Sequence, residues 1–159
     1  MSGFGCRILA SDIRENPSLK GLCTYVDNET LYKACDIISL HMPLLDSTRH
    51  FVNAETIARM KDGVTIINCA RGELMNIPDM IRGIETQKIG ALALDVFDKE
   101  DGIYHENRRD DIISNRDMAY LRQFPNVIMT QHMAFYTDAA VQSMVFCGIE
   151  GLCLSLIHI

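Results

Sequence analysis

Short apolar runs with the look of strands alternate with helix-like segments along this chain. That alternation restricts its fold more than any other feature. The runs occupy residues 7–12, 36–41, 64–68, 89–96 and 127–130. Nearly continuous apolar runs are typical of strands inside a parallel sheet, and the intervening helices supply the crossovers that parallel neighbours need. The sequence therefore predicts an α/β fold, with a parallel sheet covered by helices on both faces.

Capping residues mark where the helices should begin and end. Asn53 precedes a helix expected to run to about Met60, with Gly63 closing it. Pro78 occupies a first-turn position of a helix that reaches Thr86. Further helices are expected at residues 30–35, 114–124 and 137–150.

Length and composition indicate a single soluble domain. The chain has 159 residues, of which 48% are hydrophobic and 23% charged. A net charge of −6 argues against a nucleic-acid partner, because phosphate backbones attract basic surfaces. No apolar run approaches the roughly 20 residues of a membrane helix, and nothing after Met1 resembles a signal peptide. We expect a cytoplasmic protein without membrane contact.

The six cysteines point to neither disulfides nor a metal site. None forms a C-x-x-C pair, no Cys/His group has zinc-like spacing, and several lie in apolar runs. We therefore expect buried free thiols and no metal. They are Cys6, Cys23, Cys35, Cys69, Cys147 and Cys153.

Three ionisable residues follow three of the predicted strands. Arg71 comes after residues 64–70, Glu100 just past residues 91–97, and His132 after residues 126–131. Since ligands bind outside the carboxyl ends of parallel strands, we expect these side chains at one edge of the sheet. An arginine can bind a carboxylate, a histidine can move a proton, and an acid can keep the histidine charged. The set suits a substrate with a carboxylate beside a carbonyl.

Asp12 ends the first predicted strand. In nucleotide-binding βαβ units, an acid at the end of the second strand binds the adenosine ribose hydroxyls. Its charge would favour NAD over NADP, although the nearby Arg14 weakens that preference. Taken alone, such an aspartate more often caps a helix or turn. The Gly-rich phosphate loop is absent, because Gly3-Phe4-Gly5 abuts the strand instead of opening a helix. We expect the first strand and its loop to lie upstream of Met1.

With these residues placed, the chain resembles the D-2-hydroxyacid dehydrogenase family, in particular its D-lactate dehydrogenase branch. The matching segments are residues 36–44, 60–64, 67–72, 94–97 and 125–135. The resemblance extends from Gly3 to about Cys147. Two features suggest the branch. One is a long polar insert at residues 102–122, and the other is the aromatic Phe135, which follows His132 and Ala134.

The resemblance implies an incomplete Rossmann-type, doubly wound sheet and a role for each member of the triplet. Arg71 would bind the substrate carboxylate and polarise its carbonyl. His132 would exchange a proton with the carbonyl oxygen, while Glu100 would pair with His132, raise its pKa and orient it. Asp98 competes with Glu100 for that role, and family spacing favours Glu100.

The implied cofactor is NAD. Asp12 would bind the ribose, Asp95 would lie on the nicotinamide side, and His41 and Pro43 would line the cleft. The full set of expected cofactor-binding residues is Asp12, His41, Pro43, Cys69, Ala70 and Asp95.

Complete relatives are roughly twice as long, with two domains. We expect residues 1–132 to form part of an NAD-binding domain, and residues 133–159 a helix leading back to a missing substrate domain. The implied function is NAD-dependent reduction of pyruvate to D-lactate, or of a related 2-oxo acid to its D-2-hydroxy acid, by the full-length parent. The parent is expected to be a homodimer, and the 159-residue chain alone to be inactive.

Two alternatives remain open at this point. An NADH-sensing, corepressor-like binding protein of the same superfamily would keep the Arg/Glu/His set, although the polar insert argues against it. An inert product of a truncated gene would account for the absent glycine loop and for the abrupt apolar end at residues 152–159.

Overall fold

The computed structural model describes residues 2–100, 102–104, 107, 113–133 and 135–157. Its main sheet has four parallel strands in the order β3-β4-β5-β6. These are β3 (Ile37–Leu40), β4 (Val64–Asn68), β5 (Ile89–Leu94) and β6 (Val127–Met129). A separate parallel pair consists of β1 (Leu9–Ala10) and β2 (Thr24–Tyr25). The predicted parallel α/β fold is confirmed.

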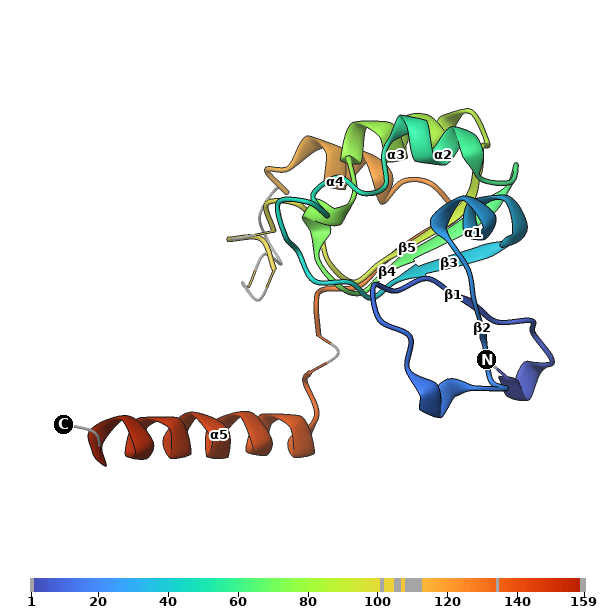
Figure 1. Ribbon diagram of the computed structural model, residues 1–159. Coiled ribbons are helices and arrows are strands. Elements are labelled where there is room, and N and C mark those ends of the chain that lie inside the picture. The colour runs from blue at the N-terminus through green and yellow to red at the C-terminus, as the bar shows by residue number, and fades with distance from the viewer. Residues whose placement is uncertain (1, 101, 105–106, 108–112, 134, 158–159) are drawn as a thin grey trace.

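Four short helices pack on one side of the main sheet, and a fifth extends away from the body (Figure 1). They are α1 (Asn28–Ala34), α2 (Ala54–Arg59), α3 (Ile77–Glu85), α4 (Arg116–Leu121) and α5 (Asp138–Ile157). The described residues also include the 3-10 turns η1 (Ser2–Phe4), η2 (Pro17–Leu19) and η3 (Gly72–Leu74). The predicted cap at Asn53 is confirmed, because its side chain accepts hydrogen bonds from the first turn of α2, and Asn115 caps α4 in the same way. The prediction that Gly63 closes α2 is wrong, since the helix ends at Arg59 with Met60 as its C-cap.

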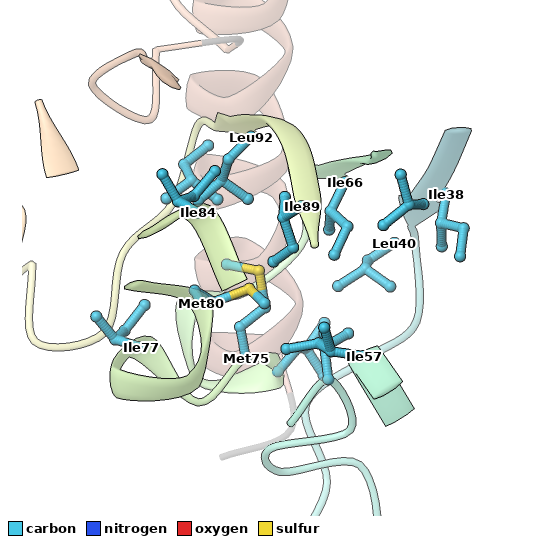
Figure 2. Close-up of a cluster of buried hydrophobic side chains, with 14 of the residues drawn as sticks. Ile38, Leu40, Ile57, Ile66, Met75, Ile77, Met80, Ile84, Ile89 and Leu92 are labelled. Carbon is cyan, nitrogen blue, oxygen red and sulfur yellow. The ribbon is translucent and has the colours of Figure 1, made fainter. Parts of the chain in front are cut away.

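The hydrophobic core lies between the main sheet and this helical layer. Side chains of the strands, such as Ile66 and Leu92, meet Met75, Met80 and Ile84 from the segment around α3 (Figure 2). Each is at most 3% exposed. Burial of a side chain of this size stabilises the fold by about 1.5–3 kcal/mol. This core makes the sheet a rigid platform for the loops at its carboxyl edge.

The prediction of helices on both faces of the sheet is wrong for the part of the chain that the structure describes. On the far face Ile37 is 50% exposed and Ile128 is 66% exposed. The reason is topological. Successive strands from β3 to β6 are immediate neighbours and advance in one direction. Right-handed crossovers therefore place all the connecting helices on the same face.

The first predicted strand, residues 7–12, is also corrected. Only Leu9–Ala10 is strand, because Asp12 turns the chain by accepting a hydrogen bond from the Arg14 N–H. Its partner β2 was not predicted, since two residues are too few to show a periodic pattern. In a doubly wound sheet of order 3-2-1-4-5-6, β1 and β2 correspond to strands 2 and 3. Among the described residues, no strand corresponds to the first strand of that order.

The last helix is longer than expected and stands apart from the core. α5 continues to Ile157 rather than stopping near Glu150. Phe146 is 73% exposed and Leu152 is 67% exposed. Within the described part of the chain, none of the helices combines the length and the apolar character of a membrane span.

The prediction of buried cysteines is wrong. All six are free thiols, and none is fully buried. Cys147 and Cys153 are exposed because they lie on α5, which leaves the body of the domain. Cys69 is exposed because it follows β4, where the chain leaves the core.

Candidate active site at the carboxyl ends of the strands

A hydrogen-bonded acid and imidazole lie at the carboxyl edge of the main sheet. His132 Nδ1 is 2.6 Å from Glu100 Oε1. Their side chains are 32% and 23% exposed, so both groups are partly shielded from water. A short hydrogen bond to a carboxylate is among the stronger ones in proteins. Of the two acids considered from the sequence, Glu100 and not Asp98 makes this contact.

The loop after β5 holds the Glu100 carboxylate in a defined orientation. Its second oxygen, Oε2, accepts a hydrogen bond of 2.7 Å from the Phe97 N–H. Lys99 bends the chain back with φ of 58°, in the left-handed region. The Glu100 carbonyl accepts from the N–H groups of Ile103 and Tyr104, each at 3.0 Å. Because both carboxylate oxygens are engaged, the acid can fix the plane of the imidazole.

Tyr104 forms part of the apolar surroundings of this acid. Burial raises the pKa of Tyr104 to about 12, and the negative charge of Glu100 adds to the increase. The hydroxyl is buried and has no hydrogen-bond partner among the residues that the structure describes. The phenol therefore stays neutral at physiological pH.

Thr130 ties the histidine strand to the preceding one. Its N–H donates to the Leu94 carbonyl at 2.8 Å, and its hydroxyl donates to Asp95 Oδ1. His132 follows with φ of 54°, a conformation that non-glycine residues adopt infrequently. The side chains of Asp95 and His132 thus emerge from adjacent strand ends.

Asn68 shapes the turn that carries Arg71. The asparagine is 0% exposed and is the single fully buried polar residue in the described chain. Its Oδ1 accepts from the Ala70 N–H at 3.0 Å, and its Nδ2 donates to the Arg71 carbonyl at 2.8 Å. The exposed Arg71 side chain donates from Nη1 to the Ala70 carbonyl at 2.7 Å. Sequence reasoning missed Asn68, although an asparagine inside an apolar run was a usable signal.

The remaining predicted cofactor residues follow β1, β3 and β4. Asp12 is exposed two residues beyond β1. His41, just after β3, pairs its Nε2 with the Ser39 hydroxyl at 2.8 Å. Pro43 and Cys69 are also exposed, and Ala70 is half-buried. The Asp12 side chain accepts a hydrogen bond from the Arg14 N–H, so this residue caps a turn, which was the simpler of the two roles considered from the sequence.

These side chains fit a dinucleotide in part. Carboxylates at Asp12 and Asp95 can accept hydrogen bonds from ribose hydroxyls and from a carboxamide. The glycine turn that would bind the diphosphate is not part of residues 1–159. The carboxylates of this chain thus suit the ribose and the carboxamide at the two ends of the cofactor, whereas the diphosphate at its centre requires the glycine turn.

Comparison with known families agrees with this geometry. Residues 1–134 match the model of the D-isomer specific 2-hydroxyacid dehydrogenase NAD-binding domain. The chain belongs to the D-isomer specific 2-hydroxyacid dehydrogenase family. The matched region contains all the predicted site residues, and the cofactor of this domain is NAD.

Named relatives come from the same family of dehydrogenases. An aromatic 2-oxoacid reductase of Clostridium sporogenes is 44% identical over 145 residues, which are 91% of this chain and 44% of the relative. The D-lactate dehydrogenase of Lactobacillus delbrueckii subsp. bulgaricus is 42% identical over 146 residues, with the same two coverages. The chain spans less than half the length of these relatives.

The solved structures agree. D-lactate dehydrogenase with NAD+ from Lactobacillus jensenii superposes with a TM-score of 0.86 at 34% identity. The superposition covers 94% of this chain and 45% of that one. The dehydrogenase fold of this family is therefore shared across nearly the whole chain.

Proposed function

We propose that the full-length protein is a cytoplasmic, NAD-dependent dehydrogenase that reduces a 2-oxo acid to its D-2-hydroxy acid. The observation that carries the proposal is the Glu100–His132 pair at 2.6 Å, at the strand ends where this fold binds its ligands. The family assignment and the names of the relatives support the same reaction class.

His132 is the proposed acid–base group. Glu100 holds Nδ1 of the imidazole, so Nε2 is the atom that exchanges a proton with the substrate oxygen. The Phe97 N–H keeps the carboxylate from rotating away while the proton moves. NAD, in its reduced form, supplies the hydride when bound.

Arg71 is the proposed anchor for the substrate carboxylate. A guanidinium can donate two parallel hydrogen bonds to a carboxylate, which fixes the orientation of the neighbouring carbonyl. Asn68 holds the turn on which Arg71 stands. The same positive charge polarises the carbonyl, because the oxygen gains negative charge as the hydride arrives.

Pyruvate and aromatic 2-oxo acids are the proposed substrates. The named relatives include a D-lactate dehydrogenase and an aromatic 2-oxoacid reductase at nearly equal identity, 42% and 44%. The groups described above recognise the carboxylate and the carbonyl that both substrates share. The side-chain pocket therefore decides between them.

A hybrid enzyme tests the proposal. The matching segment of the L. delbrueckii D-lactate dehydrogenase is replaced by this chain, and NADH oxidation is followed at 340 nm with pyruvate and with phenylpyruvate. The donor supplies the rest of the enzyme, so the assay tests the residues of this chain. We expect turnover that Glu100→Gln or His132→Gln lowers by about 10²–10⁴-fold in kcat/KM.

Asp98→Asn is the matched control, because Asp98 lies two residues from Glu100 and does not contact His132 through a described hydrogen bond. It should retain most of the turnover. A folded hybrid that binds NADH and reduces neither acid would refute the proposal. So would equal losses from Asp98→Asn and Glu100→Gln.

A further inference from the structure

Gly72 lies in a place where no side chain fits. It is buried directly after Arg71. A Cβ on Gly72 would fall far inside van der Waals contact with the carbonyl carbon and oxygen of Phe97 and with the nitrogen of Asp98. These are backbone atoms, which cannot swing aside as the end of a flexible side chain can. The Arg71 turn therefore rests against the Phe97–Asp98 peptide.

The requirement for glycine is spatial rather than conformational. The φ angle of Gly72 lies outside the left-handed region that only glycine adopts readily, unlike that of Gly63 at +76°. Any L-residue could take the backbone conformation of Gly72. What the site excludes is the β-carbon itself.

The peptide that Gly72 contacts begins the loop holding the acid. The Phe97 N–H donates to Glu100 Oε2 at 2.7 Å, and Glu100 Oε1 pairs with His132 Nδ1 at 2.6 Å. The path from Gly72 to the imidazole thus runs from the Phe97 carbonyl across the Phe97 residue to its N–H, and from there through Glu100. On its other side, the Arg71 turn is held by Asn68.

We propose that Gly72 is a positioning residue that sets the Glu100 carboxylate against His132 through the Phe97–Asp98 peptide. The two backbones touch directly, without an intervening side chain. This contact fixes the position of the turn that carries Arg71 relative to the loop that carries Glu100. The effect of Gly72 on catalysis rests on the proposed function, whereas its effect on the geometry of Glu100 does not. The geometric claim concerns the chain by itself.

The size of the expected disturbance follows from the distances. Carbon atoms pack best about 3.5–4.0 Å apart, so a methyl group at residue 72 must push the two backbones apart by roughly 1.5 Å. The Phe97 N–H bond to Glu100 is 2.7 Å long, and a hydrogen bond stretched to about 3.6 Å is no longer one. The carboxylate then loses the contact that fixes its plane.

NMR of the labelled 159-residue chain tests this without cofactor or turnover. The two readouts are hydrogen exchange at the Phe97 amide and the downfield resonance of the His132 Nδ1–H. We expect Gly72→Ala to raise Phe97 exchange at least about 10-fold, corresponding to the loss of about 1.4 kcal/mol of protection. The His132 signal should shift or broaden.

Gly90→Ala is the matched control. A Cβ on Gly90 would lie 2.5 Å from the Gly63 carbonyl oxygen, so it meets backbone as well, but Gly90 belongs to the amino-terminal part of β5. It should destabilise the sheet and leave both readouts unchanged. If Gly72→Ala leaves them unchanged, or if both variants alter them equally, the proposal is wrong.

A measurement on the unaltered chain keeps the proposal testable even if Gly72→Ala does not fold. A strong nuclear Overhauser effect between the Gly72 Hα protons and the Asp98 amide proton is expected, and its absence overturns the proposal. Because neither readout depends on activity, an inactive hybrid enzyme would refute the proposed function and leave this inference standing.

Discussion

Replacing Asn68 with alanine is predicted to destabilise the chain and to loosen the turn that carries Arg71. Asn68 is 0% exposed, and its side chain makes hydrogen bonds of 2.8 and 3.0 Å to the backbone of the next three residues. Alanine removes both and replaces neither. The Ala70 N–H and the Arg71 carbonyl then need water, which the packed turn admits poorly.

The magnitude can be worked from these two bonds. A typical hydrogen bond contributes about 1 kcal/mol net, and a partner left unsatisfied in a buried place costs about 1–3 kcal/mol. Two such bonds predict a loss of about 2–4 kcal/mol in the free energy of unfolding. For a domain of this size, that corresponds to a fall of roughly 5–15 °C in Tm.

Urea unfolding followed by far-UV circular dichroism measures this loss, with hydrogen exchange at the Ala70 amide as a local readout. Asn126→Ala is the control, because Asn126 makes one side-chain hydrogen bond, of 2.9 Å to the Gly90 carbonyl, at the opposite edge of the sheet. It should cost about 1 kcal/mol. A loss below about 0.5 kcal/mol for Asn68→Ala, or one equal to the control, would show that the turn does not depend on Asn68.

Two further predictions concern Tyr104 and α5. Burial raises the pKa of Tyr104 from 10.0 to about 12, so the folded chain keeps this proton when the unfolded chain has lost it. Stability should therefore fall as pH rises from about 10 to about 12, and Tyr104→Phe should weaken that dependence in urea midpoints measured across this range; an unchanged slope would contradict it. The exposed Phe146 and Leu152 should bind a hydrophobic dye and promote association, so changing both to serine should lower dye fluorescence and sedimentation-detected self-association without loss of helix content. Unaltered association would refute that role.

Local signals in the sequence were sufficient for most elements of the fold. Asn53 caps its helix as predicted because a capping hydrogen bond involves only residues two or three positions apart. Four of the strands were visible because each is a run of mostly apolar residues. The two-residue strand β2 was missed because it is a strand only through its pairing with β1, and its own composition gives no signal.

The candidate site divides in the same way. The positions of Arg71, Glu100 and His132 at strand ends could be predicted, since the order of strands and loops along the chain is a one-dimensional property. That Glu100 rather than Asp98 meets His132 could be expected from family spacing. The structure adds how this is achieved, through the left-handed Lys99 and the Phe97 N–H.

The sequence by itself determined the parallel α/β class, the helix caps and the strand ends that carry ionisable groups, because propensity, capping and apolar periodicity act between near neighbours. Only the tertiary structure decided that one face of the sheet stays uncovered in the described chain, that Asn68 is buried between β3 and β5, and that Gly72 touches the Phe97–Asp98 peptide. These features join segments more than 20 residues apart or depend on which side a crossover takes, and such relations exist only once the chain is folded in three dimensions.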